Sequence, residues 1–236
     1  MIRVDRSELT RKEIIRVAVN RFLNEGYAKT TVNSMAKALN MSTGNLTFYF
    51  PTKEHLLAVL VDMLCKFQWK LMAHEAKEGY SSIEAICLEL MAMASASEKD
   101  PVAKEFLLAA YTSPLCMEII RRNDQQRARE VFGKYCPDWM KEQFTEAEML
   151  VSGIEYATLM TTEPSIPLEH RLRSALNAIL AIYRVPEEIR QQKLGKVLAM
   201  DYETLGTRIF REFKIFVDHE TEQALLALVT KRKLAE

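Results

Sequence analysis

Residues 31–50 read TVNSMAKALNMSTGNLTFYF and hold two short segments with helical spacing, separated by a tight break. Thr31 has a hydroxyl placed to cap the first segment, and Asn40 can end it because asparagine tolerates the left-handed backbone conformation. Ser42 is placed to cap the second segment, which must end before Pro51. Two short helices joined by such a turn are typical of the helix-turn-helix motif.

The second of these helices opens with small polar residues. Thr43, Gly44 and Asn45 form its first turn, where small side chains permit close approach to another surface. The Asn45 amide can donate to and accept from the edges of DNA bases. We therefore expect residues 31–39 to support a recognition helix, residues 42–49, that enters the major groove.

The flanking residues predict helices that pack on this motif. Thr10 is placed to cap a first helix, in which Ile14, Ala18 and Phe22 repeat at helical spacing and which Gly26 ends. A fourth helix is expected to follow Thr52 and to run well past residue 70. Its apolar stripe consists of Leu56, Leu57, Leu60, Leu64 and Phe67.

Helical periodicity dominates the rest of the 236 residues, which contain only 7 Gly and 7 Pro. The expected helices span residues 81–97, 101–112, 115–134, 145–162, 167–184, 187–199 and 202–234. The breaks fall at Gly79, Asp100-Pro101, Ser113-Pro114, Pro137, Pro164 to Pro167 and Pro186. The sequence therefore predicts an all-α protein of ten or eleven helices.

Composition favours a globular protein, because 48% of the residues are hydrophobic and 27% are charged. No apolar run approaches the length of a membrane span, and the N-terminus lacks the apolar stretch of a signal peptide, so we expect a cytoplasmic protein. Residues 1–60 carry a net charge of +4 and the remainder −4, which marks the N-terminal part as the better partner for a polyanion.

The segment EIIRVAVNRFLNEGYAKTTVNSMAKALNMSTGNLTFYFPTKEHLL, residues 13–57, resembles the DNA-binding module of the tetracycline-repressor-like (TetR) family of bacterial regulators. The resemblance runs from about Thr10 to Leu60 and includes Gly26-Tyr27, Thr30-Thr31 and Tyr49-Phe50-x-x-Lys53. It implies an N-terminal helix-turn-helix three-helix module, residues 1–58. A larger helical dimerisation and ligand-binding domain, residues 59–236, would follow.

The resemblance also places Tyr49 and Lys53 on the phosphate backbone and adds the Thr31 hydroxyl there. Two positions depart from the family pattern. Thr47 stands where many members have an aromatic, and it could read a base. Phe48 stands where a histidine is common, and it either contacts a thymine methyl or packs against the fourth helix. The predicted DNA-binding residues are Thr31, Ser42, Thr43, Gly44, Asn45, Thr47, Phe48, Tyr49 and Lys53.

By the same resemblance, a homodimer would bind a pseudo-palindromic DNA operator. Its surface would be a four-helix bundle built from residues 145–162 and 167–184 of each subunit. The first helix offers a shallow face and the second an apolar stripe, although both could instead pack inside one subunit. The predicted dimer residues are Gly153, Ala157, Thr161, Leu172, Leu176, Ile179 and Tyr183.

The middle helices would hold a hydrophobic or amphipathic small-molecule effector. The predicted ligand-binding residues are Phe106, Tyr111, Met117, Tyr156 and Met160, although each is also a plausible core residue. What the C-terminal helices after Pro186 add to the dimer or to the pocket stays open.

No enzyme is expected, because the four histidines have no metal-ligand spacing and no nucleotide-binding or nucleophile motif occurs. No metal and no cofactor are expected either. The sequence therefore predicts a ligand-responsive transcriptional regulator, most simply a repressor. Two alternatives remain: a cysteine-based redox or stress sensor using Cys65, Cys87, Cys116 or Cys136, and a helical adaptor regulated by a protein partner.

Overall fold

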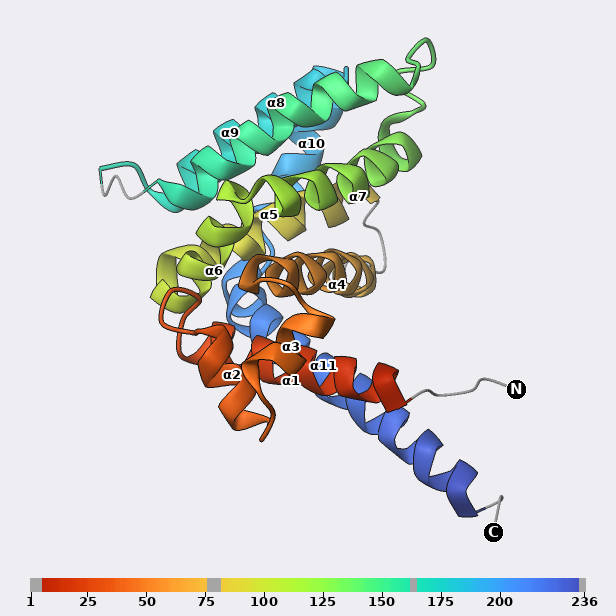
Figure 1. Cartoon of the computed structure of the whole chain (residues 1–236). Helices are drawn as coiled ribbons and strands as arrows, with labels where there is room; N and C mark the ends of the chain where they lie inside the picture. Colours follow the sequence, from red (N-terminus) through yellow and green to blue (C-terminus); the bar gives the residue numbers. More distant parts are fainter. Residues whose placement is uncertain (1–5, 76–81, 162–164, 234–236) are drawn as a thin grey trace.

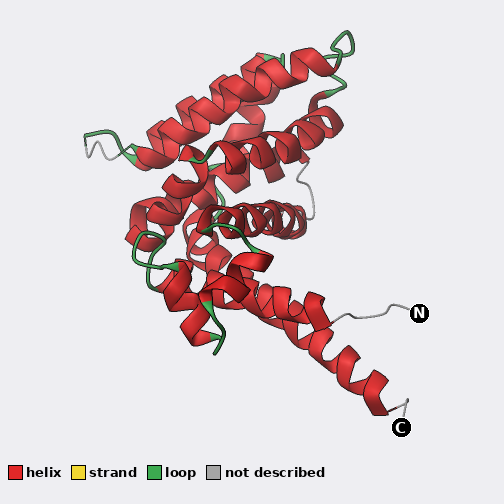
Figure 2. Cartoon of the chain, viewed as in Figure 1, coloured by secondary structure: helices red, strands yellow, loops and turns green. Residues whose placement is uncertain are grey.

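The computed structural model describes residues 6–75, 82–161 and 165–233, and all regular structure in these ranges is helical (Figure 1, Figure 2). This confirms the predicted all-α class. Eleven helices lie in the described residues: α1 Arg6–Asn24, α2 Val32–Ala38, α3 Thr43–Tyr49, α4 Lys53–Glu75, α5 Ser82–Lys99, α6 Pro101–Thr112, α7 Pro114–Phe132, α8 Lys141–Met160, α9 Leu168–Ile182, α10 Glu187–Val197 and α11 Tyr202–Lys233. None of them is long and apolar enough to cross a membrane.

Where they fall on described residues, the predicted helix boundaries agree with these elements to within about two residues, except at the starts of α1 and α8. Helix α8 begins at Lys141, four residues before the predicted start. Thr10 does not cap α1, because this helix already includes Arg6 and the Thr10 hydroxyl donates to the Arg6 carbonyl at 3.0 Å. Gly26 and Asn40 do adopt the left-handed conformation, with φ of 97° and 51°. The predicted breaks at Gly79 and Pro164 lie outside the described residues.

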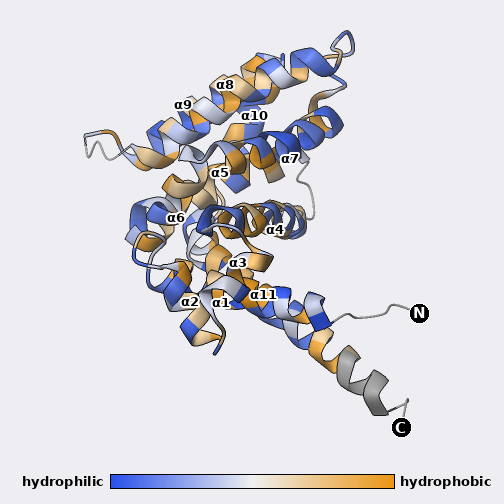
Figure 3. Ribbon diagram, viewed as in Figure 1, coloured by the Kyte–Doolittle hydropathy of each residue, from blue (hydrophilic) through white to orange (hydrophobic). Residues whose placement is uncertain are grey.

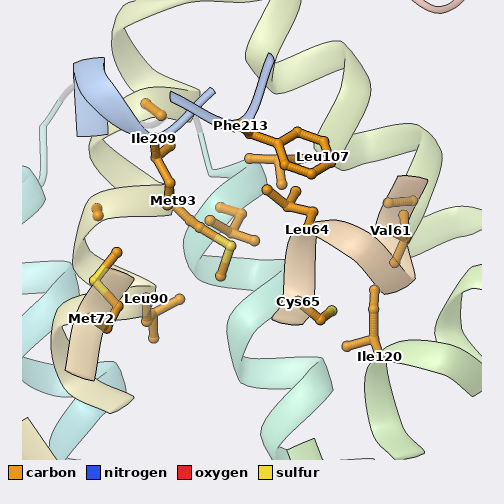
Figure 4. Packing of buried hydrophobic residues seen from close by; sticks show 14 of the residues in the cluster. Val61, Leu64, Cys65, Met72, Leu90, Met93, Leu107, Ile120, Ile209 and Phe213 are labelled. Atoms are coloured by element: carbon orange, nitrogen blue, oxygen red, sulfur yellow. The ribbon is translucent and has the colours of Figure 1, made fainter. Parts of the chain in front are cut away.

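Helix α5 forms the centre of the molecule, and 13 of its 18 residues are buried. It contacts α4, α6, α8, α9, α10 and α11. Figure 4 shows Met93 of α5 among apolar side chains of neighbouring helices, including Leu64 of α4 and Phe213 of α11. The core is therefore assembled around one helix that nearly every later element covers.

Helix α11 connects this core to the N-terminal helices. It packs along both α5 and α1, and Figure 1 shows it leaving the core beside α1. Lys12 of α1 forms an ion pair with Glu220 at 3.5 Å, and the Lys214 ammonium donates to the Asn24 side chain at 2.6 Å. The C-terminal helix thus holds the N-terminal module against the rest of the chain.

Helices α8 and α9 lie side by side at the end of the molecule opposite α1–α3 (Figure 1). The prediction that the apolar stripe of α9 forms a dimer surface is wrong, because α5, α8 and α10 of the same subunit cover it. The residues concerned are Leu172, Leu176, Ile179 and Tyr183, each at most 3% exposed. By contrast, Gly153 and Ala157 of α8 are exposed, and Thr161 is half-buried.

Candidate DNA-binding module and ligand cavity

Local hydrogen bonds define the two helices of the motif. The Thr31 hydroxyl accepts from the Ser34 amide at 3.1 Å, and the Ser34 hydroxyl accepts from the Thr31 amide at 3.2 Å, which gives a reciprocal cap. The Ser42 hydroxyl accepts from the Asn45 amide at 3.1 Å and starts α3. Both predicted caps are confirmed.

Two residues of the recognition segment anchor it in the core. Leu46 is fully buried and Phe50 is 2% exposed. Ala36 of α2 is also buried, which fits its small size. Since these side chains point inward, α3 must present its remaining positions to solvent.

The outward positions are those that the sequence predicts to face DNA. Ser42, Thr43, Gly44 and Asn45 are exposed. Phe48 is 79% exposed and meets only the edge of the Tyr49 ring, with centroids 5.4 Å apart. This exposure excludes the alternative in which Phe48 packs against the fourth helix.

The other predicted DNA-binding residues on α3 and α4 are half-buried or form hydrogen bonds within the protein. Thr47 and Tyr49 are half-buried, and the Thr47 hydroxyl donates to the Gly44 carbonyl at 3.1 Å. The Lys53 ammonium donates to the carbonyls of Tyr27 and Thr30 at 2.9 and 3.1 Å. Lys53 thus ties α4 to the α1–α2 turn, and its contact with phosphate stays a prediction.

The charge on this surface suits a polyanion. No Asp or Glu occurs from Gly26 to Lys53, whereas Lys29 and Lys37 are both exposed there. This segment therefore contributes lysines and no carboxylate of its own to the surface. Its lysines attract phosphate at long range, and its hydroxyl and amide groups can then bond locally.

The sequence profile described as "Bacterial regulatory proteins, tetR family" matches residues 14–60, which include all of this motif. Residues 14–60 therefore form a helix-turn-helix module of the TetR type, with which regulators of this family bind DNA. Regulators of this family are not enzymes.

Solved structures share the fold of this chain at low sequence identity. RolR in complex with resorcinol is 17% identical, with a TM-score of 0.64 over 82% of this chain and 97% of that one. The FadR repressor of Thermus thermophilus in complex with lauroyl-CoA is 19% identical, with a TM-score of 0.55 over 75% and 96%. No curated protein matches the chain.

The helical part of the chain contains a partly open cavity between α4–α9, with a volume of about 70 Å³. Phe106 and Tyr111 line it, as predicted for a ligand site. Met117, Tyr156 and Met160, which the sequence also predicts for a ligand site, do not line this cavity. Tyr156 instead lies on the outer side of α8 and is 39% exposed.

Buried polar groups that the sequence did not reveal face the same cavity. Arg127 donates to both carboxylate oxygens of Glu89, at 2.8 and 3.1 Å, and to the Cys65 carbonyl, and it lies 3.5 Å from Asp124. The polar run 121–130 contains two of these residues and resembles a solvent-exposed face (Figure 3). No local pattern distinguishes the two that turn inward.

Two carboxyl–phenol pairs complete the polar lining. The Tyr111 hydroxyl donates to Glu155 at 3.1 Å, and the Tyr183 hydroxyl donates to Glu148. Burial raises the pKa of Glu148 to about 7 and raises the pKa of Glu155 well above its ordinary value. Burial likewise raises the pKa of Asp124. These carboxyls are therefore costly to ionise in the cavity.

We expect the free energy of unfolding to fall as pH rises from about 4.5 to about 7. The folded-state pKa of Glu148 lies above its unfolded value of 4.5, so its stabilising contribution is complete below that value and is lost as pH passes about 7. Glu148→Gln should flatten this part of the curve in urea unfolding. The matched control is Glu142→Gln, which removes an exposed carboxyl from the same helix. Equal slopes for wild type and Glu148→Gln would contradict the assignment.

The cysteines give little support to redox sensing. Cys65, Cys87, Cys116 and Cys136 are all free and buried. Burial raises the pKa of each thiol, in the case of Cys87 to about 12, which disfavours the reactive thiolate. Within the described residues, no group of His, Cys, Asp and Glu could hold a metal ion.

Proposed function

We propose that this protein is a ligand-responsive repressor of the TetR family that binds a pseudo-palindromic operator as a homodimer in the cytoplasm. The observation that carries the proposal is the course of α4. This single helix begins beside the recognition helix at Lys53 and continues to Leu64 and Gln68 at the cavity. The proposed boundary between domains 1–58 and 59–236 therefore falls inside a helix, which favours mechanical coupling between the two.

Contacts at the start of α4 strengthen this coupling. The Ser113 hydroxyl, at the junction of α6 and α7, donates to Glu54 at 2.5 Å. Glu105 of α6 accepts from the Ala28 amide in the α1–α2 turn. Because α6 and α7 also line the cavity, a ligand that shifts them would move the DNA-binding module.

A ligand can change operator affinity only by the difference in its affinity for the two arrangements. Resorcinol and lauroyl-CoA are the small molecules named with the similar structures of RolR and FadR. Those complexes support the proposal that a helical domain of this shape accommodates an effector.

We place the dimer surface on the outer face of α8. Met149 and Leu150 are 56% and 61% exposed, and the small residues Gly153 and Ala157 follow them on this face. Exposed apolar side chains beside small residues allow two helices to approach closely. The exposed residues Ala178 and Ala181 of α9 extend the surface.

Gly153→Arg should convert the dimer to a monomer without unfolding the subunit, because a Cβ at Gly153 meets no atom within 4 Å. Operator affinity should fall steeply, since one recognition helix is left to bind one half-site. Sedimentation velocity and operator titration measure the two effects. Gly195→Arg is the matched control, because Gly195 is equally open but lies on α10. A Gly153→Arg variant that stays dimeric would move the interface elsewhere.

The DNA-binding part of the proposal is tested by selecting binding sites from random duplex DNA. Asn45→Ala should relax the base preference at one position in each half-site, because one good base contact contributes about 1–3 kcal/mol of discrimination. Phe48→Ala should weaken operator binding yet leave thermal stability unchanged, because the ring is 79% exposed. Glu118→Ala, exposed on α7, is the control. Failure of the wild type to enrich any palindromic sequence would overturn the proposed function.

A further inference from the structure

The ionisable side chains that line the cavity are unbalanced in charge. Among the described lining residues, four carboxyls, those of Glu89, Asp124, Glu148 and Glu155, face a single cation, Arg127. Arg127 donates two hydrogen bonds to Glu89 and is therefore largely committed to it. Arg127 also forms an ion pair with Asp124, at 3.5 Å, and no cation of the described lining pairs with Glu148 or Glu155. Carboxyls thus outnumber cations in the lining, and Asp124, Glu148 and Glu155 are the three that Arg127 does not hold through two hydrogen bonds.

These three carboxyls converge on one space from two helices. Glu148 and Glu155 are seven residues apart on α8 and so lie on the same helical face, and Asp124 comes from α7. The phenol bonds from Tyr183 and Tyr111 each engage one carboxylate oxygen of Glu148 and Glu155. The second oxygen of each carboxyl is not used by these bonds. An incoming hydrogen-bond donor therefore has several acceptors within one cavity.

A second observation points to a missing polar group. Gln68 lines the cavity and is only 2% exposed, yet its Nε2 atom has no hydrogen-bond partner within the described chain. This atom is a hydrogen-bond donor, so leaving it unpaired costs about 1–3 kcal/mol, and it calls for an acceptor on the bound molecule or on a water that enters with it, not for a donor such as an ammonium. The rest of the wall is apolar, with Leu64, Leu90, Phe106, Phe132, Val151 and Ile179. The site thus combines an acidic polar end with space for an apolar body.

We propose that the effector is an amphipathic organic cation, such as a protonated primary amine on an aromatic or aliphatic body. Its ammonium would donate to Asp124, Glu148 and Glu155, and its apolar part would lie against Phe106 and its aliphatic neighbours. The inference rests on the proposed function only in calling this molecule the effector. The preference for positive charge follows from the lining alone.

Electrostatics favours an organic cation over an anionic ligand and over a neutral one. An anionic ligand would meet three carboxyls and one guanidinium already paired, so like-charge repulsion disfavours it. A neutral alcohol or phenol can form hydrogen bonds but cannot compensate ionised carboxyls. The raised pKa values of Asp124, Glu148 and Glu155 agree with this reasoning. Burial outweighs the opposing effect of Arg127 on Asp124, and that of Arg127 and Arg121 on Glu148, so the protonated form is favoured until a further cation enters.

The test compares three probes of similar size on the full-length protein by calorimetry: 2-phenylethylamine, 2-phenylethanol and phenylacetate. The amine should bind about tenfold or more tightly than the alcohol, because hydrogen bonds between charged partners exceed neutral ones. Phenylacetate should bind most weakly. The same comparison is made with 4-phenylbutylamine, 4-phenylbutanol and 4-phenylbutyrate, so that a mismatch in length does not mask the effect.

Glu155→Gln and Asp124→Asn should each weaken amine binding by about tenfold while leaving alcohol binding nearly unchanged. Both replacements are close in shape, and circular dichroism with urea unfolding checks that each variant folds. Should one of them not fold, Glu148→Gln supplies the same comparison. Glu118→Gln, which removes an exposed carboxyl from α7, should bind all probes like wild type.

The inference is overturned if the alcohol or the acid binds as tightly as the amine, if neither amine binds at millimolar concentration, or if the carboxamide variants bind the amine like wild type. Operator titration separates this result from the proposed function. Release of operator DNA by a neutral or anionic probe would leave the proposed function standing and reject the cation. If the protein binds the amines selectively but recognises no operator, the inference about the cation stands and the proposed function is rejected.

Discussion

Arg127→Met is expected to lower the free energy of unfolding by about 3–5 kcal/mol, because it leaves buried carboxyls without their cation. The Arg127 side chain is 10% exposed and that of Glu89 is 12% exposed, so water cannot replace the lost bonds. The guanidinium also lies 5.2 Å from the centroid of the Trp69 ring. Urea unfolding with a constant m-value measures the loss.

Two further variants define the origin of this effect. Arg122→Met removes an arginine from the same helix whose side chain is 66% exposed, and we expect a change within about 0.5 kcal/mol. Adding Glu89→Gln to Arg127→Met should restore part of the stability, since one unpaired carboxyl is removed. If the double variant is less stable than Arg127→Met alone, the charge on Glu89 is not what makes the single replacement costly.

Gly206→Val is expected to cost at least about 3 kcal/mol, at the upper end of what overpacking usually costs. A Cβ at Gly206 would lie 2.7 Å from the Ala92 carbonyl oxygen and 3.1 Å from the Ala96 nitrogen. Both are backbone atoms of α5, so relief requires the two helices to separate. The variant should therefore also loosen α11, detectable as faster amide hydrogen exchange along that helix.

Gly195→Ala is the control for this prediction. Gly195 lies on the exposed side of α10, and a Cβ there meets no atom within 4 Å. Alanine should stabilise the helix by up to about 1 kcal/mol through its better helix propensity. Replacements at the two glycines that change stability in the same direction would contradict the close approach of α11 to α5.

Local chemistry explains why most helix ends could be predicted from the sequence. Ser42 and Ser113 cap their helices through bonds to amides three residues on, and Asn40 adopts its turn conformation independently of distant contacts. The exposed first turn of the recognition helix follows from the same rules. Its anchors Leu46 and Phe50 were also identifiable, because helical spacing alone separates them from the exposed positions.

Predictions failed where the answer depends on which element covers a helix. Helical periodicity correctly shows that one face of α9 must be buried. That face packs against α8 and α5 of the same subunit and not against a partner subunit. Tyr156 and Tyr111 look equally suited to a ligand site, yet only Tyr111 lines the cavity. Arg127 and Asp124 carry no local sign of burial. Tertiary packing decides which helix covers which face, and no local sequence pattern shows it.

The packing of α11 on α5 affects how the protein is made. These helices lie about a hundred residues apart in the chain, and Ile209, Phe213 and Val217 of α11 are buried in the core. At ribosomal rates, synthesis of that separation takes roughly 5–20 s, during which the apolar surface of α5 lacks its late cover. This core can therefore close only after α11 has been synthesised. Conditions that slow elongation would prolong exposure of α5 and favour aggregation of the nascent chain.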